Sequence, residues 1–129
     1  MTADMTQAAP ASVLIVEDDA DLRDLLVQFV TLEGFAATAV DNGRDALTHL
    51  ESGRRPALVV LDLMMPHLDG FEFLRRQRER DDLRAIPVIV LTALDHVHAD
   101  LVEGVAVLSK PVDFDRLLNL VRLHCCAQS

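Results

Sequence analysis

The sequence is poor in aromatic residues, which make up 4% of its 129 residues, and it contains no tryptophan or tyrosine. Proteins that bind single-stranded nucleic acid stack the bases on aromatic side chains, so this composition argues against that mode of binding. The net charge of −9 argues in the same direction, because an acidic surface repels the phosphate backbone. We therefore expect no nucleic-acid partner.

Long apolar segments and spaced cysteines are also lacking. No apolar run reaches the ~20 residues of a transmembrane helix, and the N-terminus lacks the basic and apolar regions of a secretory signal. We therefore expect no membrane association and a cytoplasmic location. The two cysteines, Cys125 and Cys126, are adjacent, and neighbouring cysteines seldom form a disulfide. In a reducing compartment they are expected to remain thiols at the end of a helix.

The length of 129 residues fits one domain, and half of the residues are apolar, which suffices for a hydrophobic core. Residues 1–11 are mainly Thr, Ala, Gln and Pro without periodicity, so we predict a disordered leader there. A single domain is predicted over residues 12–126, followed by a short tail over residues 127–129.

Short apolar runs alternate with stretches of helical periodicity along this domain. Apolar residues within 22–30 follow the spacing of an amphipathic helix, Gly34 is suited to end it, and Asp113 is suited to cap the last helix. Apolar strands that alternate with helices predict a parallel sheet that is covered on both faces. The predicted strands are Ser12–Val16, Phe35–Val40, Leu58–Leu61, Val88–Leu91 and Val105–Leu108.

The central strand is followed directly by a single carboxylate, Asp62, and then by loop signals at Pro66 and Gly70. In open α/β sheets, ligands bind in the crevice beyond the carboxyl ends of the strands. Asp62 is therefore a candidate nucleophile for a phosphoryl group. From this stretch alone, an aspartate that caps a helix or forms a turn explains the pattern equally well.

Other strands end in residues that fit the same chemistry. The first strand leads to Glu17 and Asp18, the fourth to Thr92 and the fifth to Lys110. Because parallel strands end at the same edge of a sheet, these side chains are predicted to converge on Asp62. Clustered carboxylates repel each other unless a cation neutralises them, and Mg²⁺ prefers oxygen ligands. A lysine and a hydroxyl are suited to contact phosphoryl oxygens.

The chain resembles the receiver domain of bacterial two-component response regulators from Val13 to about Leu123. The resemblance implies a flavodoxin-like α/β fold, a doubly wound five-stranded parallel sheet with strand order 2-1-3-4-5. The motifs that carry the resemblance are Val13–Asp19 (VLIVEDD), Asp62–Pro66 (DLMMP), Asp69–Gly70, Pro87–Ala93 (PVIVLTA) and Lys110–Pro111.

The resemblance also implies a role for each residue of the site. Asp62 would be the phosphoacceptor, Thr92 and Lys110 would contact the phosphoryl group, and the Lys110–Pro111 bond would be cis. The implied cofactor is Mg²⁺. Its implied ligands are Asp18, Asp62, Glu17 through a water molecule and the main-chain carbonyl of Met64.

The implied function is that of a stand-alone receiver domain, a signalling switch or phosphorelay intermediate without a separate enzymatic domain. The phosphoryl donor would be a phosphohistidine on a sensor histidine kinase or a histidine phosphotransfer protein, and a downstream protein target would receive the signal. The alternative is a receiver-like interaction module with atypical or no phosphorylation-dependent output. An aspartyl phosphatase and a flavodoxin-type flavin-binding protein fit the sequence less well. The phosphatase needs a second aspartate at the position of Met64, and in the flavin-binding protein the acids at 17–19 would repel the flavin phosphate.

Two features depart from the family pattern. The interval from Thr92 to Lys110 is short, so the fourth helix, within Ala93–Gly104, is predicted to be shortened, and Val107 replaces the usual aromatic residue. In the last helix, Leu120 and Leu123 lie off the predicted inner stripe. These leucines either cover the gap left by the short helix or form a surface for a partner or a homodimer.

Overall fold

The computed structural model describes residues 11–63, 70–93 and 105–126. Five parallel strands form one sheet in the order β2-β1-β3-β4-β5, as the resemblance implied. The predicted fourth helix within 93–104, the predicted leader 1–11 and the tail 127–129 lie outside the described residues, apart from Ala11 and Ala93. The carbonyl of Ala11 accepts a hydrogen bond from the amide of Ala36 at 3.0 Å. The elements are β1 (Ser12–Val16), α1 (Ala20–Leu32), β2 (Ala36–Val40), α2 (Gly43–Glu51), β3 (Leu58–Asp62), α3 (Gly70–Arg78), β4 (Val88–Thr92), β5 (Val105–Ser109) and α4 (Phe114–Cys126).

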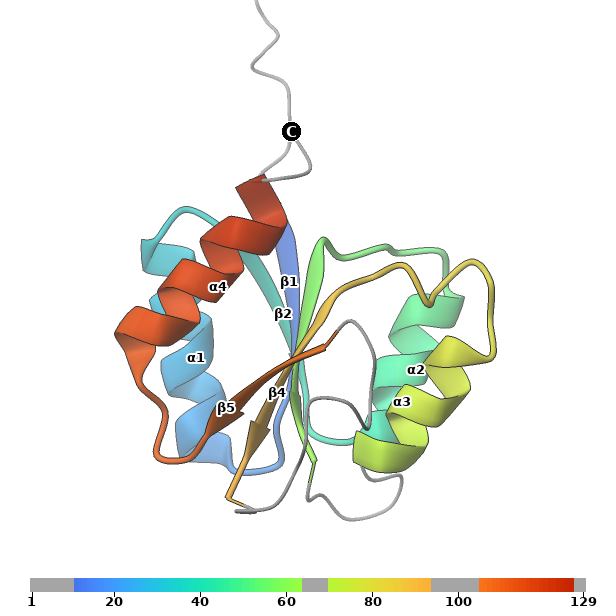
Figure 1. Ribbon diagram of the computed structural model, residues 1–129, viewed down its shortest axis with the longest axis horizontal. Coiled ribbons are helices and arrows are strands. Elements are labelled where there is room, and N and C mark those ends of the chain that lie inside the picture. Colours follow the sequence, from blue (N-terminus) through green and yellow to red (C-terminus); the bar gives the residue numbers. More distant parts are fainter. Residues whose placement is uncertain (1–10, 64–69, 94–104, 127–129) are drawn as a thin grey trace, which may run out of the picture.

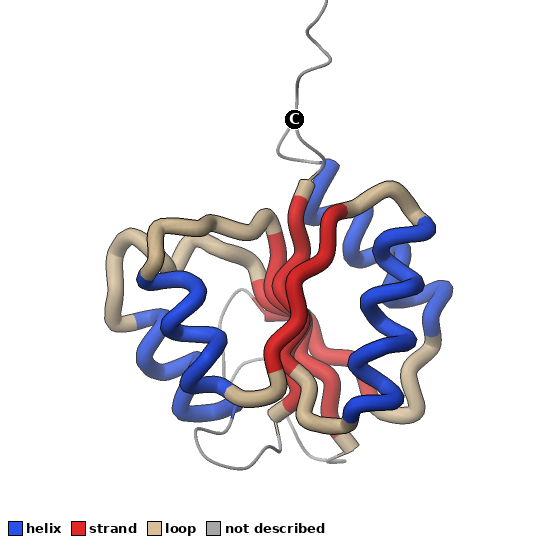
Figure 2. Tube along the Cα trace, turned by 180° about the vertical axis from the view of Figure 1, so that it is seen from behind, coloured by secondary structure: helices blue, strands red, loops and turns tan. Residues whose placement is uncertain are grey.

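The sheet stands between two layers of helices. Figure 1 shows α1 and α4 on one side of the sheet and α2 and α3 on the other, and Figure 2 shows the same arrangement from behind. The alternation of side chains along each strand feeds both layers, because successive residues point to opposite faces. In β1, Val13 and Ile15 pack with the core on the α1 and α4 side, whereas Leu14 and Val16 pack with the core on the α2 and α3 side.

The central strand β3 is buried over its whole length, as expected for a strand with helices on both faces. Strands β3 and β4 each extend one residue beyond the predicted end, because Asp62 still pairs with Leu91 and Thr92 still pairs with Ser109. The strand register therefore holds Asp62 and Thr92 at the carboxyl edge of the sheet.

The helix ends follow local hydrogen-bonding rules. Gly34 has a φ of +96° after α1, the left-handed conformation expected of a glycine stop. The amide of Phe35 donates to the carbonyl of Val30 at 3.0 Å, so this residue belongs to the helix end and β2 begins one residue later than predicted. The Asp113 carboxylate accepts hydrogen bonds from the amides of Asp115 and Arg116, which confirms the predicted cap of α4.

The two leucines that lie off the predicted stripe of α4 have different environments. Leu120 is partly buried and packs against the core on the α1 and α4 side, whereas Leu123 is 62% exposed. Leu120 therefore contributes to the core, and Leu123 is the more accessible of the two. Among the described helices, none combines the length and apolar character that crossing a membrane requires.

Candidate functional site

The predicted site residues that the structure describes gather at the carboxyl edge of the sheet. Glu17 and Asp18 follow β1, and Asp62 ends β3. Carboxylate oxygens of these three residues all lie within 4.8 Å of one another. Glu17 and Asp62 are 1% and 3% exposed, whereas Asp18 is exposed. The site is therefore a cluster of three acids, of which Glu17 and Asp62 are buried and Asp18 is exposed to solvent.

Two further residues reach this edge from β4 and β5. Thr92 ends β4 and is 1% exposed, and its carbonyl accepts a hydrogen bond from the amide of Lys110 at 2.7 Å. The Lys110–Pro111 bond is cis, as the resemblance implied. Met64, the expected main-chain ligand, lies outside the described residues.

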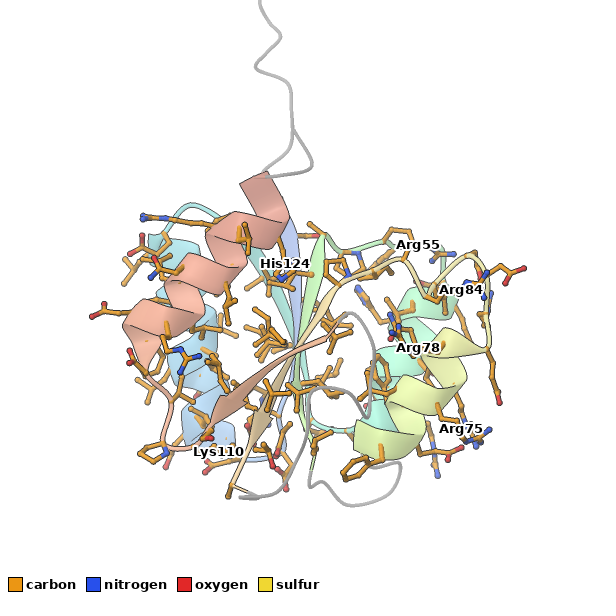
Figure 3. The ribbon with its side chains drawn as sticks, viewed as in Figure 1. Arg55, Arg75, Arg78, Arg84, Lys110 and His124 are labelled. Carbon is orange, nitrogen blue, oxygen red and sulfur yellow. The ribbon has the colours of Figure 1, made fainter. Side chains whose placement is uncertain are left out.

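Lys110 is the cation that faces the acids. Its ammonium nitrogen lies 3.3 Å from Glu17 Oε1 and 3.4 Å from Asp62 Oδ1, and Figure 3 labels it at the edge where the strands end. Partial burial disfavours its charge, but the attraction of both carboxylates outweighs this and raises the pKa of the ammonium group above its ordinary value. Lys110 therefore remains positively charged at neutral pH.

Glu17 is held by hydrogen bonds to most of its polar atoms. Its amide donates to the carbonyl of Val40 at 3.1 Å, and its Oε2 accepts from the amide of Asp19 at 3.1 Å. Its carbonyl accepts from Arg23 Nη1 at 3.1 Å. Oε1 is buried and accepts no hydrogen bond from the described residues, although Lys110 lies within ion-pair distance.

The charge of Glu17 is unfavourable in this environment. Burial, together with the smaller effect of the nearby Asp62 carboxylate, raises the pKa of its carboxyl group to about 7, against the opposing effects of the Asp19 amide and Lys110. The positive charge of Lys110 therefore does not balance the negative charges of the acid cluster. A divalent cation would stabilise both buried carboxylates in their charged forms.

The donor set fits a hard divalent cation. Three carboxylates within 4.8 Å of one another supply oxygen ligands, and one buried oxygen of Glu17 lacks a hydrogen-bond donor among the described residues. Mg²⁺ is bound by a few carboxylates while it keeps several waters, so an exposed side such as that of Asp18 suits it. The residues present therefore match the implied magnesium site.

The start of α3 packs directly against the backbone of Asp62. The amide of Gly70 donates to the carbonyl of Leu63 at 3.0 Å. A Cβ atom at Gly70 would lie 2.6 Å from Leu63 Cα and 2.7 Å from the carbonyl oxygen of Asp62. Only glycine permits this approach without a shift of backbone atoms, so Gly70 helps to fix Asp62.

The proteins that this chain resembles in sequence and in fold include receiver domains of response regulators. The family model of the response regulator receiver domain matches residues 13–122, so the chain belongs to this family. It is 39% identical over 127 residues to the uncharacterized 14.6 kDa protein in the sodA1 3′ region of Leptolyngbya boryana, covering 95% of this chain and 96% of that protein. The signal receiver domain of a signal transduction histidine kinase from Syntrophus aciditrophicus superposes with a TM-score of 0.80 at 34% identity, covering 91% of each chain.

Similarity also extends to longer regulators. The chain is 36% identical over 121 residues to response regulator Rre1 from Synechocystis sp., covering 89% of this chain and 52% of that protein. The chain thus spans about half the length of this regulator.

Two residues that shape the site were not identified as such from the sequence. Arg23 lies near the start of α1, where the other charged residues are acidic. Only the fold shows that its side chain reaches back to the Glu17 carbonyl. The sequence marks Gly70 only as a loop signal, and its contact with the backbone at Asp62 depends on where α3 packs.

Proposed function

We propose that this chain accepts a phosphoryl group on Asp62 from a phosphohistidine donor, in a reaction that depends on Mg²⁺. The observation that carries the proposal is the position of Asp62 at the end of the central strand, with its Oδ1 3.4 Å from Lys110 and within the acid cluster. A nucleophile, a fixed positive charge and a cation site in one place are the parts that phosphoryl transfer requires.

Each residue has a defined part in the proposed transfer. A carboxylate oxygen of Asp62 forms a bond to phosphorus as the bond from phosphorus to the donor imidazole nitrogen breaks, and the imidazole leaves with that electron pair. Lys110 would attract the phosphoryl oxygens, and the hydroxyl of Thr92, the last residue of β4, would donate to one of them.

Glu17, Asp18 and Asp62 would hold the magnesium ion, with the Met64 carbonyl as the further expected ligand. When bound, Mg²⁺ lowers the repulsion between the acids and the incoming phosphoryl group. The chain's own contribution is to hold these carboxylates close together before the donor arrives, so that little reorganisation is needed at the moment of transfer.

The proposed role is supported by the receiver-domain family of the chain and by the acid cluster that Lys110 faces. The domain over residues 12–126 acts as a signalling switch or phosphorelay intermediate in the cytoplasm, and not as a separate enzyme. Its donor is a sensor histidine kinase or a histidine phosphotransfer protein, and it passes the signal to a downstream protein. A homodimer through α4 would use the exposed Leu123.

Intact-mass measurement after incubation with Mg²⁺ and a small acyl phosphate tests the proposal. The parent should gain the mass of one phosphoryl group, and it should gain none when EDTA removes the metal. Asp62→Asn should abolish the gain. Asp24→Asn makes the same chemical change at an exposed position of α1 and should be labelled like the parent.

Full labelling of the Asp62→Asn protein would overturn the assignment of the phosphoacceptor. If neither an acyl phosphate nor a phosphohistidine donor labels the parent, the chain is instead a receiver-like interaction module.

A further inference from the structure

Arg23 makes a contact that joins helix α1 to the acid-bearing loop. Its Nη1 atom donates to the main-chain carbonyl of Glu17 at 3.1 Å, across six positions of sequence. Glu17 is 1% exposed, so this carbonyl is withdrawn from water. A hydrogen bond from a charged group to a buried carbonyl is stronger than an ordinary backbone hydrogen bond.

The peptide that Arg23 contacts is the one that links Glu17 to Asp18. The loop on the other side of this peptide is already fixed, because Asp19 accepts hydrogen bonds from the amides of Asp21 and Leu22 and so caps α1. The amide of Asp19 also donates to Glu17 Oε2. With its carbonyl held by Arg23, the peptide plane before Asp18 has a defined orientation.

We propose that Arg23 is a positioning residue of the acid cluster, which directs the Asp18 side chain toward the metal by fixing the peptide between Glu17 and Asp18. The inference rests on the proposed magnesium site. Asp18 is exposed, so its side chain has few neighbours to restrain it, and its direction depends on the backbone. Residues that orient metal ligands through hydrogen bonds, without binding the metal themselves, commonly have large effects on metal affinity.

Charge and geometry make opposite predictions for this residue. If Arg23 acted only through its charge, removing it would make the cluster more negative and strengthen the binding of a cation. If Arg23 acts by holding the peptide, removing it releases the loop and weakens binding. The sign of the change in metal affinity therefore separates the two explanations.

The surroundings of Arg23 make substitution practicable. Its side chain borders a surface hollow of about 240 Å³ that is also lined by Ala39, Val40, Asp41 and Asp45. Water can enter this hollow when the guanidinium group is removed, so Arg23→Met leaves no sealed cavity in the core. Arg122→Met is a matched control, because Arg122 pairs with Glu33 at the far end of α1 and carries the same charge.

Calorimetric titration of each folded protein with MgCl₂ measures the effect. Arg23→Met should bind Mg²⁺ about tenfold more weakly than the parent or worse. Arg23→Lys keeps a charged donor but loses the planar guanidinium group, so its affinity for Mg²⁺ should lie between those of Arg23→Met and the parent. Arg122→Met should bind like the parent. In the metal-free proteins, the Asp19 amide should exchange its hydrogen faster in Arg23→Met than in the parent and Arg122→Met.

Equal or tighter binding by Arg23→Met, together with unchanged exchange at Asp19, would overturn the positioning role. If Arg23→Met does not fold, Arg23→Lys decides the question, and affinity equal to that of the parent overturns the proposal. A parent that binds no Mg²⁺ would instead overturn the proposed function, and the metal-free exchange would still test the role of Arg23.

Discussion

Replacing Glu17 with glutamine should stabilise the metal-free protein above pH 7. The side chain is 1% exposed, and its carboxyl group has a pKa of about 7, because burial and the neighbouring Asp62 carboxylate disfavour the charge. Glutamine keeps the shape of the side chain and an acceptor for the Asp19 amide, but it carries no charge. The variant therefore removes the electrostatic cost and keeps the local packing.

The sign follows from the protons bound in each state. Between the ordinary pKa of 4.5 and about 7, folded Glu17 holds a proton that the unfolded chain has released. The free energy of unfolding therefore falls as the pH rises through this window. The interval from 4.5 to about 7 corresponds to about 3 kcal/mol, at ~1.4 kcal/mol per pH unit. Because the mouth of the site is open to water, we expect Glu17→Gln to gain about 1–3 kcal/mol above pH 7.

Urea unfolding in EDTA, followed by far-UV circular dichroism across this pH range, measures the effect. The gain should shrink toward zero as the pH falls below 4.5, where Glu17 is protonated in both states. Excess Mg²⁺ should reverse the order of stability, because a ligand stabilises the parent by about 4.1 kcal/mol at 1,000 times its Kd, and the variant has lost one metal ligand. Asp24→Asn removes an exposed acid and should change stability little.

Two results would refute the reasoning. One is a Glu17→Gln protein that is less stable than the parent above pH 7 in EDTA. The other is a stability difference that stays constant from pH 4.5 to pH 7, because that would place its origin in packing and not in the buried charge.

Two further predictions concern positions that the fold places in different environments. Gly70→Ala should cost about 1–3 kcal/mol, because its Cβ would clash with backbone atoms of Asp62 and Leu63. It should also slow phosphorylation of Asp62 by acyl phosphate. Gly34→Ala, at a φ of +96° with nothing within 4 Å of the added Cβ, should cost about 1–2 kcal/mol through backbone strain alone. Equal phosphorylation rates in both alanine variants would contradict a role of Gly70 at the site. Leu120→Glu should lower the melting temperature, because its side chain packs against the core, whereas Leu123→Glu, at a 62% exposed position, should not. A melting temperature of Leu120→Glu equal to that of the parent would show that Leu120 is not part of the core.

The strands could be predicted well because each is a short apolar run between polar segments. All five predicted strands are present, with ends within one residue of the prediction. The differences between the predicted and observed strand ends arise from strand pairing and from turns, which an apolar run in the sequence does not specify. Phe35 bonds back to the helix end, and Asp62 and Thr92 continue the ladder because their neighbours are in register. The strand order came from the family resemblance, since apolar runs do not specify which strands are neighbours.

The composition of the site was also open to prediction, because strand ends in a parallel sheet must meet at one edge. Glu17, Asp18 and Asp62 converge as expected, with Lys110 beside them. Their charges and types could be taken from the sequence. Which carboxylate is buried and which is exposed could not, because burial depends on the helices and loops that pack around the edge.

The sequence by itself therefore determined the alternating architecture and the set of side chains that meet at the end of the sheet. The tertiary structure decided how that set is held: the carbonyl of Glu17 on the guanidinium of Arg23, and the backbone of Asp62 against Gly70. The physical reason is that periodicity and composition act along the chain, within a turn of helix or a strand. Close approach and desolvation arise between elements, so they exist only once the elements have packed.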